Sequence, residues 1–197
     1  FYTSMVNGGF IETQSVVADY DPGKKKLTVY NCNQLAHTLQ HTISRTIDMP
    51  LDDIRVIIPN VGGGFGGKTE ATPSVLIASI MSRKLGRPVK LTYERDESIY
   101  QNKGRHACHL SLKLGFNKDG TIQALDLSIL LDGGAHSGWG FVVLWFIAAL
   151  THLPYKVRNI RYNGRRVYTN KPTPGAQRSF GGVQARTAVE SCFDMAA

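Results

Sequence analysis

Apolar and polar residues alternate with two different periods along this chain, which predicts a mixture of strands and helices. Alternating stretches rich in β-branched and aromatic residues predict strands, whereas apolar residues three or four positions apart predict helices. The ranges predicted as strands are 12–20, 27–31, 54–58, 89–93, 106–116, 122–131 and 160–168. The ranges predicted as helices are 35–47, 73–85 and 183–197. Because strands and helices do not alternate strictly, the pattern favours the α+β class.

Turn and loop residues separate these elements. Residues 117–120, with the sequence Asn-Lys-Asp-Gly, predict a hairpin turn between the strands at 106–116 and 122–131. The run 141–150 is apolar throughout and is compatible with a buried helix or a buried strand. A bilayer span needs about 20 such residues, so no membrane partner is expected. Three glycine-rich stretches are predicted as loops: 60–68, 132–140 and 171–182.

Composition excludes several classes of protein. The chain has 197 residues, of which 42% are hydrophobic and 19% charged, and this balance excludes intrinsic disorder. The net charge is +8, from 23 Lys and Arg against 15 Asp and Glu. The basic residues are scattered and accompany no nucleic-acid-binding motif, so we expect no nucleic acid partner.

Cysteine usage points to a reducing compartment. Cys32, Cys108 and Cys192 are odd in number and far apart in the sequence. They form neither a disulfide framework nor the spacing of a zinc or iron–sulfur site. A cytoplasmic location is therefore expected.

The loop at 62–68 carries the strongest chemical signal. Five glycines surround Phe65, so the backbone lies bare on both sides of the ring and its N–H groups can approach an anion or a bulky cofactor closely. Gly63, Gly67, Lys68 and Thr69 also satisfy the bare spacing of a phosphate-binding loop. No apolar strand ending in a magnesium-binding Asp accompanies them. A structural turn and a nucleoside triphosphate site remain as alternatives.

The loop and several other segments together resemble the molybdenum hydroxylases, the family of xanthine oxidase and aldehyde oxidase. The loop reads Val-Gly-Gly-Gly-Phe-Gly-Gly-Lys over 61–68, and the resemblance covers roughly residues 10–197 in the family's order. The other segments that carry it are 87–89 (RPV), 94–97 (ERDE), 104–106 (GRH), 114–122 (LGFNKDGTI), 168–170 (YTN) and 178–182 (RSFGG).

This resemblance implies that residues 1–197 form one segment of a molybdopterin-binding domain of the xanthine/aldehyde oxidase type, incomplete at both ends. The implied cofactor is molybdenum–molybdopterin in its cytosine dinucleotide form. The implied reaction hydroxylates an aromatic or N-heteroaromatic substrate with oxygen derived from water. The family's general-base glutamate is expected beyond Ala197, so no catalytic residue is expected in this chain.

The resemblance also implies a hetero-oligomeric enzyme. Electrons would pass to iron–sulfur clusters and FAD on partner chains, namely an iron–sulfur subunit and an FAD subunit. The remaining molybdopterin-binding part would supply the base.

Individual site residues carry over from the family's motifs. Gln34 stands 31 residues before Phe65, and it matches a glutamine whose amide donates to an oxygen on molybdenum. The residues implied to bind the cofactor are Gln34, Gly64, Phe65, Gly66 and Arg178. Gln34, Phe65 and Arg178 would surround the metal without ligating it, and the aromatic ring of Phe180 would pack on the substrate.

Two departures from the family bear on the substrate. Purine-oxidising members have a glutamate directly after the lysine of the loop, whereas here Thr69 holds that place and Glu70 follows. They also have an arginine nine residues before the position of Tyr155, where this chain has Phe146. Thr69, Glu70 and Phe146 are therefore predicted substrate-site residues of an apolar pocket, which argues against xanthine.

Three alternatives stay open at this point. A nicotinate dehydrogenase is compatible with the expected heteroaromatic substrate. A 4-hydroxybenzoyl-CoA reductase is similar in its loop, GGGFGGKTE, and runs its metal site reductively. A non-catalytic assembly module with the same fold would retain the loop without turnover.

Overall fold

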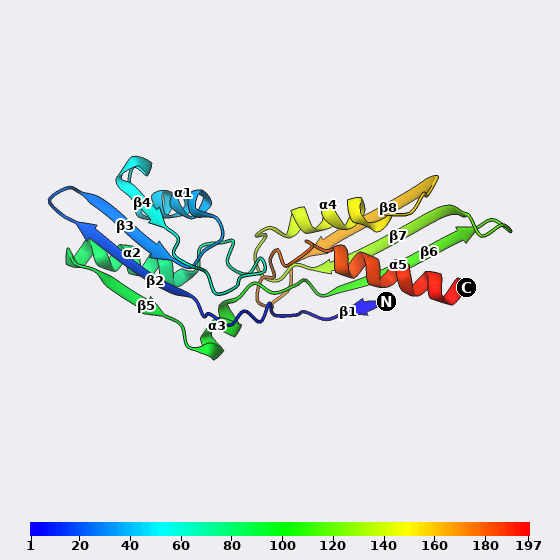
Figure 1. Ribbon diagram of the computed structural model, residues 1–197, viewed down its shortest axis with the longest axis horizontal. Helices are drawn as coiled ribbons and strands as arrows, with labels where there is room; N and C mark the ends of the chain where they lie inside the picture. The colour runs from blue at the N-terminus through cyan, green and yellow to red at the C-terminus, as the bar shows by residue number, and fades with distance from the viewer. The chain divides into compact units, whose positions relative to one another are not determined.

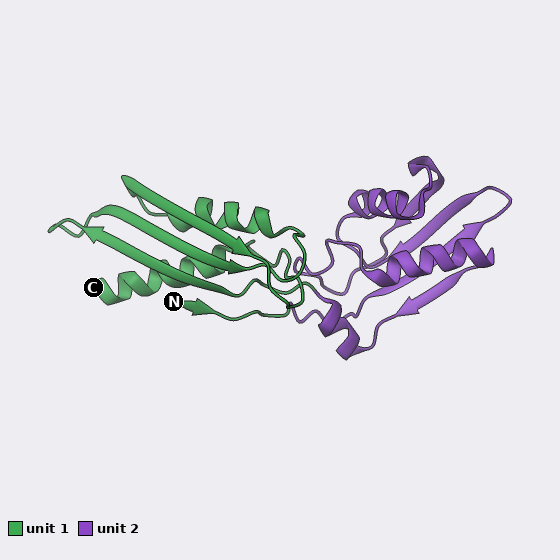
Figure 2. Ribbon diagram, turned by 180° about the vertical axis from the view of Figure 1, so that it is seen from behind, with its two compact units in different colours: residues 1–7, 103–197 green, residues 8–102 purple.

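The computed structural model describes residues 1–197 and divides them into two compact units (Figure 2). Unit 1 consists of residues 1–7 and 103–197, and unit 2 consists of residues 8–102. Each unit has its own four-stranded sheet and its own hydrophobic core. The sequence pattern gives no sign of this division, because unit 2 interrupts unit 1 without a linker of distinctive composition.

The sheet of unit 2 has the strand order β4-β3-β2-β5. Its strands are β2 (Ser15–Asp21), β3 (Lys26–Asn31), β4 (Ile54–Ile57) and β5 (Val89–Thr92). β2 pairs antiparallel with β3 and β5, whereas β3 and β4 are parallel. Alternate residues of the central strands, including Val16, Ala18, Leu27 and Val29, are buried on one face. The predicted strands at 12–20, 27–31, 54–58 and 89–93 are confirmed within a few residues.

Two helices cover that face of the unit 2 sheet (Figure 1): α1 (Ala36–Ile47) and α2 (Pro73–Leu85). α1 buries Leu39, Ile43 and Ile47, which lie one helical turn apart. α2 begins with a proline, whose fixed φ suits a first turn, and ends at Gly86 with φ 62°. A short 3₁₀ helix, Leu51–Asp53, precedes β4.

A third helix of unit 2, α3 (Arg95–Gln101), was not predicted. Glu94 caps its first turn, and the side chain of Glu97 accepts a hydrogen bond from the Glu94 N–H at 2.8 Å. This reciprocal cap uses glutamate where Ser, Thr, Asp or Asn is usual, so its sequence signature is weak.

The sheet of unit 1 has the strand order β1-β6-β7-β8. Its strands are β1 (Tyr2–Thr3), β6 (Cys108–Phe116), β7 (Ile122–Asp132) and β8 (Asn159–Val167). β6 and β7 form the predicted antiparallel hairpin, and β7 and β8 are parallel. In the hairpin turn, Asp119 Oδ1 accepts a hydrogen bond from the Thr121 N–H and Gly120 has φ 81°.

Helices α4 (Gly140–Thr151) and α5 (Gly182–Ala196) pack on one face of the unit 1 sheet (Figure 1). α4 contains the apolar run at 141–150, and it buries only one stripe, which includes Val143 and Ile147. Phe141 and Trp145 are exposed on its outer side. The choice between helix and strand left open by the sequence is thus resolved as helix, and the mixed α and β composition confirms the fold class. None of the helices is long and apolar enough to cross a membrane.

Candidate functional site

The glycine-rich loop of unit 2 is fixed to Gln34 by three hydrogen bonds. Gln34 Oε1 accepts from the backbone N–H groups of Gly66 at 3.0 Å and Lys68 at 3.3 Å, while the Gln34 N–H donates to the Lys68 carbonyl at 2.8 Å. In an amide side chain the oxygen accepts hydrogen bonds and the nitrogen donates them. The loop occupies Oε1, whereas the Nε2 donor of this exposed residue makes no hydrogen bond within the chain.

The loop requires glycine at the positions that touch Gln34. A Cβ on Gly64 would lie 2.5 Å from Gln34 Oε1, so any side chain there would displace the glutamine. Gly66 has φ 99°, which only glycine adopts readily. Phe65 has φ 52°, an uncommon conformation for a bulky residue, and its side chain is 47% exposed. Strained, exposed residues of this kind concentrate at functional sites.

Three backbone N–H groups of the loop are left without an acceptor within the chain. The Gly67 N–H donates to the Gly64 carbonyl at 2.8 Å, which closes the turn. The N–H groups of Gly63, Gly64 and Phe65 make no such bond. Gln34 Nε2 likewise makes no hydrogen bond within the chain. Of these residues, Gly64 is buried whereas Phe65 and Gln34 are exposed.

A buried ion pair holds the end of the loop. The Lys68 side chain is 1% exposed, and its Nζ lies 2.5 Å from Glu12 Oε2 and 4.7 Å from the centre of the Phe10 ring. Glu12 Oε2 also accepts from the Gly62 N–H at 2.9 Å, so one carboxylate binds both ends of the loop. Because Lys68 Nζ is engaged with Glu12, it does not point outward to a phosphate, which argues against a nucleoside triphosphate site.

The electrostatics of Glu12 follow from these contacts. Burial alone would raise the pKa of Glu12, but the hydrogen bond and charge of Lys68 and the Gly62 N–H outweigh it and lower the pKa below its ordinary 4.5. The backbone before Glu12 is fixed in turn by Arg95, whose guanidinium donates to the carbonyls of Phe10 and Ile11.

Thr69 and Glu70 both stand next to this loop. Thr69 Oγ1 donates to the Gly66 carbonyl at 2.8 Å, so its hydroxyl stabilises the conformation of the loop itself. The Glu70 carbonyl accepts a hydrogen bond from Asn33 Nδ2 at 3.2 Å. Their predicted contact with substrate stays a prediction.

The remaining predicted residues lie in unit 1. The rings of Phe146, on α4, and Phe180, in the loop before α5, stack with their centroids 5.1 Å apart and their planes at 26°. Arg178 is exposed two residues before Phe180. The structure thus brings Phe146 and Phe180 together in unit 1, and Gln34 and the loop at 64–66 together in unit 2.

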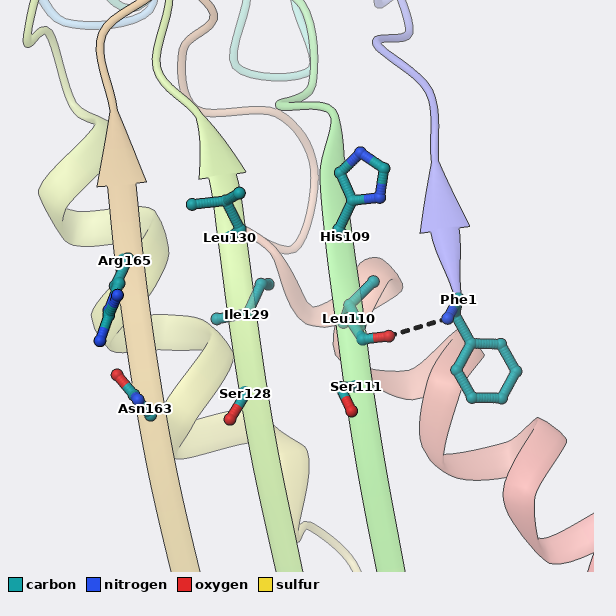
Figure 3. Close-up of a pocket in the computed structure, with 9 residues that line it drawn as sticks. All are labelled: Phe1, His109, Leu110, Ser111, Ser128, Ile129, Leu130, Asn163 and Arg165. Carbon is teal, nitrogen blue, oxygen red and sulfur yellow. Dashed lines mark hydrogen bonds between the residues drawn. The ribbon is translucent and has the colours of Figure 1, made fainter.

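An open groove of about 580 Å³ lies elsewhere on unit 1, on the sheet face opposite α4 and α5 (Figure 3). Polar and apolar residues of three strands line it, together with the N-terminal residue. They include Ser111 of β6, Ser128 of β7, Asn163 and Arg165 of β8, and Phe1. None of the predicted site residues contributes to this groove.

Residues 1–197 match the family described as the molybdopterin cofactor-binding domain. The chain belongs to this family. It is 35% identical over 185 residues to aldehyde oxidase 2 of Cavia porcellus, covering 93% of this chain and 14% of that protein. It is 31% identical over 172 residues to the xanthine dehydrogenase molybdenum-binding subunit of Escherichia coli O157:H7, covering 87% of this chain and 23% of that protein.

Solved structures agree with this family assignment. The aldehyde oxidoreductase of Desulfovibrio gigas has a TM-score of 0.94 and 27% identity, covering all of this chain and 22% of that chain. The chain is therefore homologous to molybdenum hydroxylases and spans only about a seventh to a quarter of the length of these relatives.

Sequence reasoning missed the ion pair that supports the molybdopterin-domain loop. Glu12 and Lys68 are 56 residues apart, and neither is flanked by a pattern that indicates pairing. The sequence places Lys68 at the end of the loop and in the spacing of a phosphate-binding loop, and neither observation indicates an ion pair. The signal that could have found it is the placement of a long cationic side chain directly after a buried strand and five glycines.

We predict that Glu12→Leu destabilises the protein more than Lys68→Met does. The first change leaves the charge of Lys68 buried without a partner and lowers the free energy of unfolding by about 3 kcal/mol, the low end of the range for a broken buried pair. The second leaves only Glu12, whose carboxylate is 33% exposed and reaches water. Urea unfolding of both variants and of the double variant measures this.

The double variant is the control for that ordering. Removing both charges should recover most of the stability that Glu12→Leu alone loses, because no unpaired charge remains. Equal losses in the two single variants, or a double variant no better than Glu12→Leu, would contradict the role assigned to the pair.

A second prediction concerns His106, which is 1% exposed in unit 1. Burial and the nearby charge of Arg166 lower its pKa from 6.5 to about 4, against a smaller opposing effect of Asp132. The unfolded chain therefore binds this proton more readily than the folded chain. Stability should rise with pH between about 4 and 6.5, by up to ~3 kcal/mol.

The matched variants are His106→Gln and His37→Gln, the latter on the exposed side of α1. His106→Gln should flatten the pH dependence of the urea midpoint between pH 4 and 6.5, whereas His37→Gln should leave it as in the wild type. Unchanged slopes in His106→Gln would show that His106 does not titrate in this way.

Proposed function

We propose that this chain holds the molybdenum cofactor of a hydroxylase through the loop at 64–66 and Gln34. One observation carries the proposal: Gln34 Oε1 is occupied by two loop N–H groups, which commits its Nε2 donor to a partner outside the loop. The glutamine is thereby preorganised as a hydrogen-bond donor before any ligand arrives.

The residues present fit such a group. A cofactor rich in oxygen acceptors needs donors that are not already satisfied, and Gln34 Nε2 and the N–H groups of Gly64 and Phe65 supply them. A bulky cofactor also needs bare backbone, which the glycines beside Phe65 provide. When bound, the cofactor supplies a redox-active metal at which oxygen derived from water is transferred to the substrate.

In this proposal the residues of the chain orient the cofactor and stabilise negative charge that develops on oxygen. Gln34 and the backbone donors of the loop face developing negative charge on oxygen, as in an oxyanion hole. The proton is taken by a glutamate carried outside residues 1–197, in the remaining molybdopterin-binding part of the protein.

The proposed substrate is a small aromatic or N-heteroaromatic molecule. The stacked rings of Phe146 and Phe180 offer an apolar, flat contact surface. The side chain at position 146 carries no charge that could orient a purine, and the Thr69 hydroxyl is already engaged with Gly66. These two features disfavour xanthine, although some relatives are named for xanthine and others for aldehydes.

The proposed setting is a cytoplasmic hetero-oligomer. Partner chains would carry the iron–sulfur clusters and FAD that remove electrons, and the molybdopterin would be the cytosine dinucleotide form. One relative is named as a molybdenum-binding subunit, which supports an assembly of several subunits.

We predict that Gln34→Ala lowers kcat by roughly 10²- to 10³-fold, the cost of removing one such donor, with a smaller effect on KM. The measurement is steady-state turnover of an aromatic aldehyde by the full-length protein, with molybdenum counted per polypeptide. Gln101→Ala, an exposed glutamine at the end of α3, is the matched control and should behave as wild type.

The same experiment separates the alternatives. Unchanged kcat in Gln34→Ala would remove this residue from the site. Wild-type protein that is native and free of molybdenum would favour a non-catalytic assembly module. Molybdenum-loaded protein that reduces 4-hydroxybenzoyl-CoA but oxidises no aromatic aldehyde or nicotinate would favour the reductase.

A further inference from the structure

The segment that carries Arg178 and Phe180 has an unusual backbone. Ser179 (φ 75°), Phe180 (φ 47°) and Gly181 (φ 103°) are consecutive left-handed residues, and two of them are not glycine. Each such non-glycine residue costs of order 1–3 kcal/mol and persists only where its surroundings hold it. The bonds within the segment, Phe180 N–H to Gln177 and Gly182 N–H to Ser179, are local turns and do not fix it to the sheet.

The guanidinium of Arg105 provides the missing attachment. Its Nη2 donates to the Arg178 carbonyl at 2.9 Å, and its Nη1 donates to Gln184 Oε1 at 3.2 Å. The backbone of Arg105 is itself fixed, because its N–H donates to the Val6 carbonyl at 2.7 Å. The fork of one arginine thus spans the residue before the strained segment and the helix after it.

Gln184 sets the direction of that fork. It is 1% exposed on the first turn of α5, and its Nε2 donates to the His106 carbonyl at 3.2 Å. With Nε2 engaged, Oε1 must face Arg105. A buried amide satisfied on both atoms has one orientation, so the guanidinium has one as well.

From this geometry we infer that Arg105 is a positioning residue, which holds the Arg178 carbonyl and so aims the ring of Phe180 against Phe146, with Gln184 as its support. The inference rests on the proposed function only in taking Phe180 as a substrate contact. Arginine suits the task because its planar fork holds two N–H donors in fixed directions toward two acceptors, whereas the lysine ammonium is a single compact group on a flexible stem.

The first test is hydrogen exchange of the full-length protein, which needs no cofactor and no turnover. In Arg105→Met, the amides of Phe180 and Gly182 should exchange roughly 10- to 100-fold faster, the factor for losing a hydrogen bond to a charged group. Amides of the β6–β7 ladder should not change. Arg165→Met is the matched control, because Arg165 is an exposed residue of β8 whose guanidinium makes no hydrogen bond.

Two further variants distinguish the effect of the forked hydrogen bonds from the effect of the positive charge and from a general loss of folding. Arg105→Lys keeps the charge and should still show fast exchange at Phe180 and Gly182. Gln184→Met keeps Arg105 and should show the same local effect. Wild-type exchange in all three variants, or full protection in Arg105→Lys, would overturn the inference.

The second test is a double-mutant cycle on KM for an aromatic aldehyde. Arg105→Met should raise KM about tenfold or more in the wild-type background and have no further effect in a Phe180→Ala background, because both changes remove the same contact. Additive effects would show that Arg105 does not act through Phe180. If the wild type holds no molybdenum while the exchange result stands, the proposed function fails and the positioning of the segment does not.

Discussion

The two hydrogen bonds that Gln34 Oε1 accepts from Gly66 and Lys68 are the interaction on which the candidate site depends. A loop that must present bare backbone cannot carry the side chains that normally anchor a loop. Its anchors have to come from elsewhere and bind its main chain. Gln34 binds the main chain of the loop at Gly66 and Lys68. The Glu12 carboxylate binds the Gly62 N–H at the start of the loop and the buried ammonium group of Lys68 at its end.

The same arrangement recurs in unit 1. There the strained segment from Ser179 to Gly181 is held through the carbonyl of the preceding residue, Arg178, by the side chain of Arg105, whose own orientation is set by Gln184. In both units the hydrogen bonds of a glutamine amide fix the surrounding groups: in unit 2 Gln34 Oε1 holds two N–H groups of the loop, and in unit 1 the fully bonded Gln184 amide orients the Arg105 guanidinium. Rigid, side-chain-poor backbone of this kind suits a protein that must approach a large cofactor closely.

Local patterns predicted most of the fold. The hairpin of β6 and β7 was predicted from the distinctive turn residues at 117–120 between two strand-like runs, and the structure confirms the pairing and buries Leu125, Leu127, Ile129 and Leu131 in alternation. α4 could not be assigned, because it is apolar all round and burial of only one stripe distinguishes it from a strand. The division into two units depends on contacts between distant parts of the chain, which no local pattern shows.

The candidate site was predictable only in part. The spacing of Gln34 from the loop and the segment at 178–182 came from resemblance to a family, and the structure adds the contacts that give them a physical role. Glu12 and Arg105 were beyond reach, since each acts on a partner 56 or 73 residues away through an ion pair or a backbone carbonyl. Such long-range contacts leave no periodic trace in a sequence.

The most direct test of the central claim is a crystal structure of the full-length protein with its cofactor bound. The account predicts that Gln34 Oε1 keeps its bonds to the Gly66 and Lys68 N–H groups while Nε2 lies within hydrogen-bond distance, about 2.7–3.2 Å, of an oxygen on the molybdenum centre. A Gln34 amide turned away from the metal, or a cofactor bound far from Phe65, would contradict it.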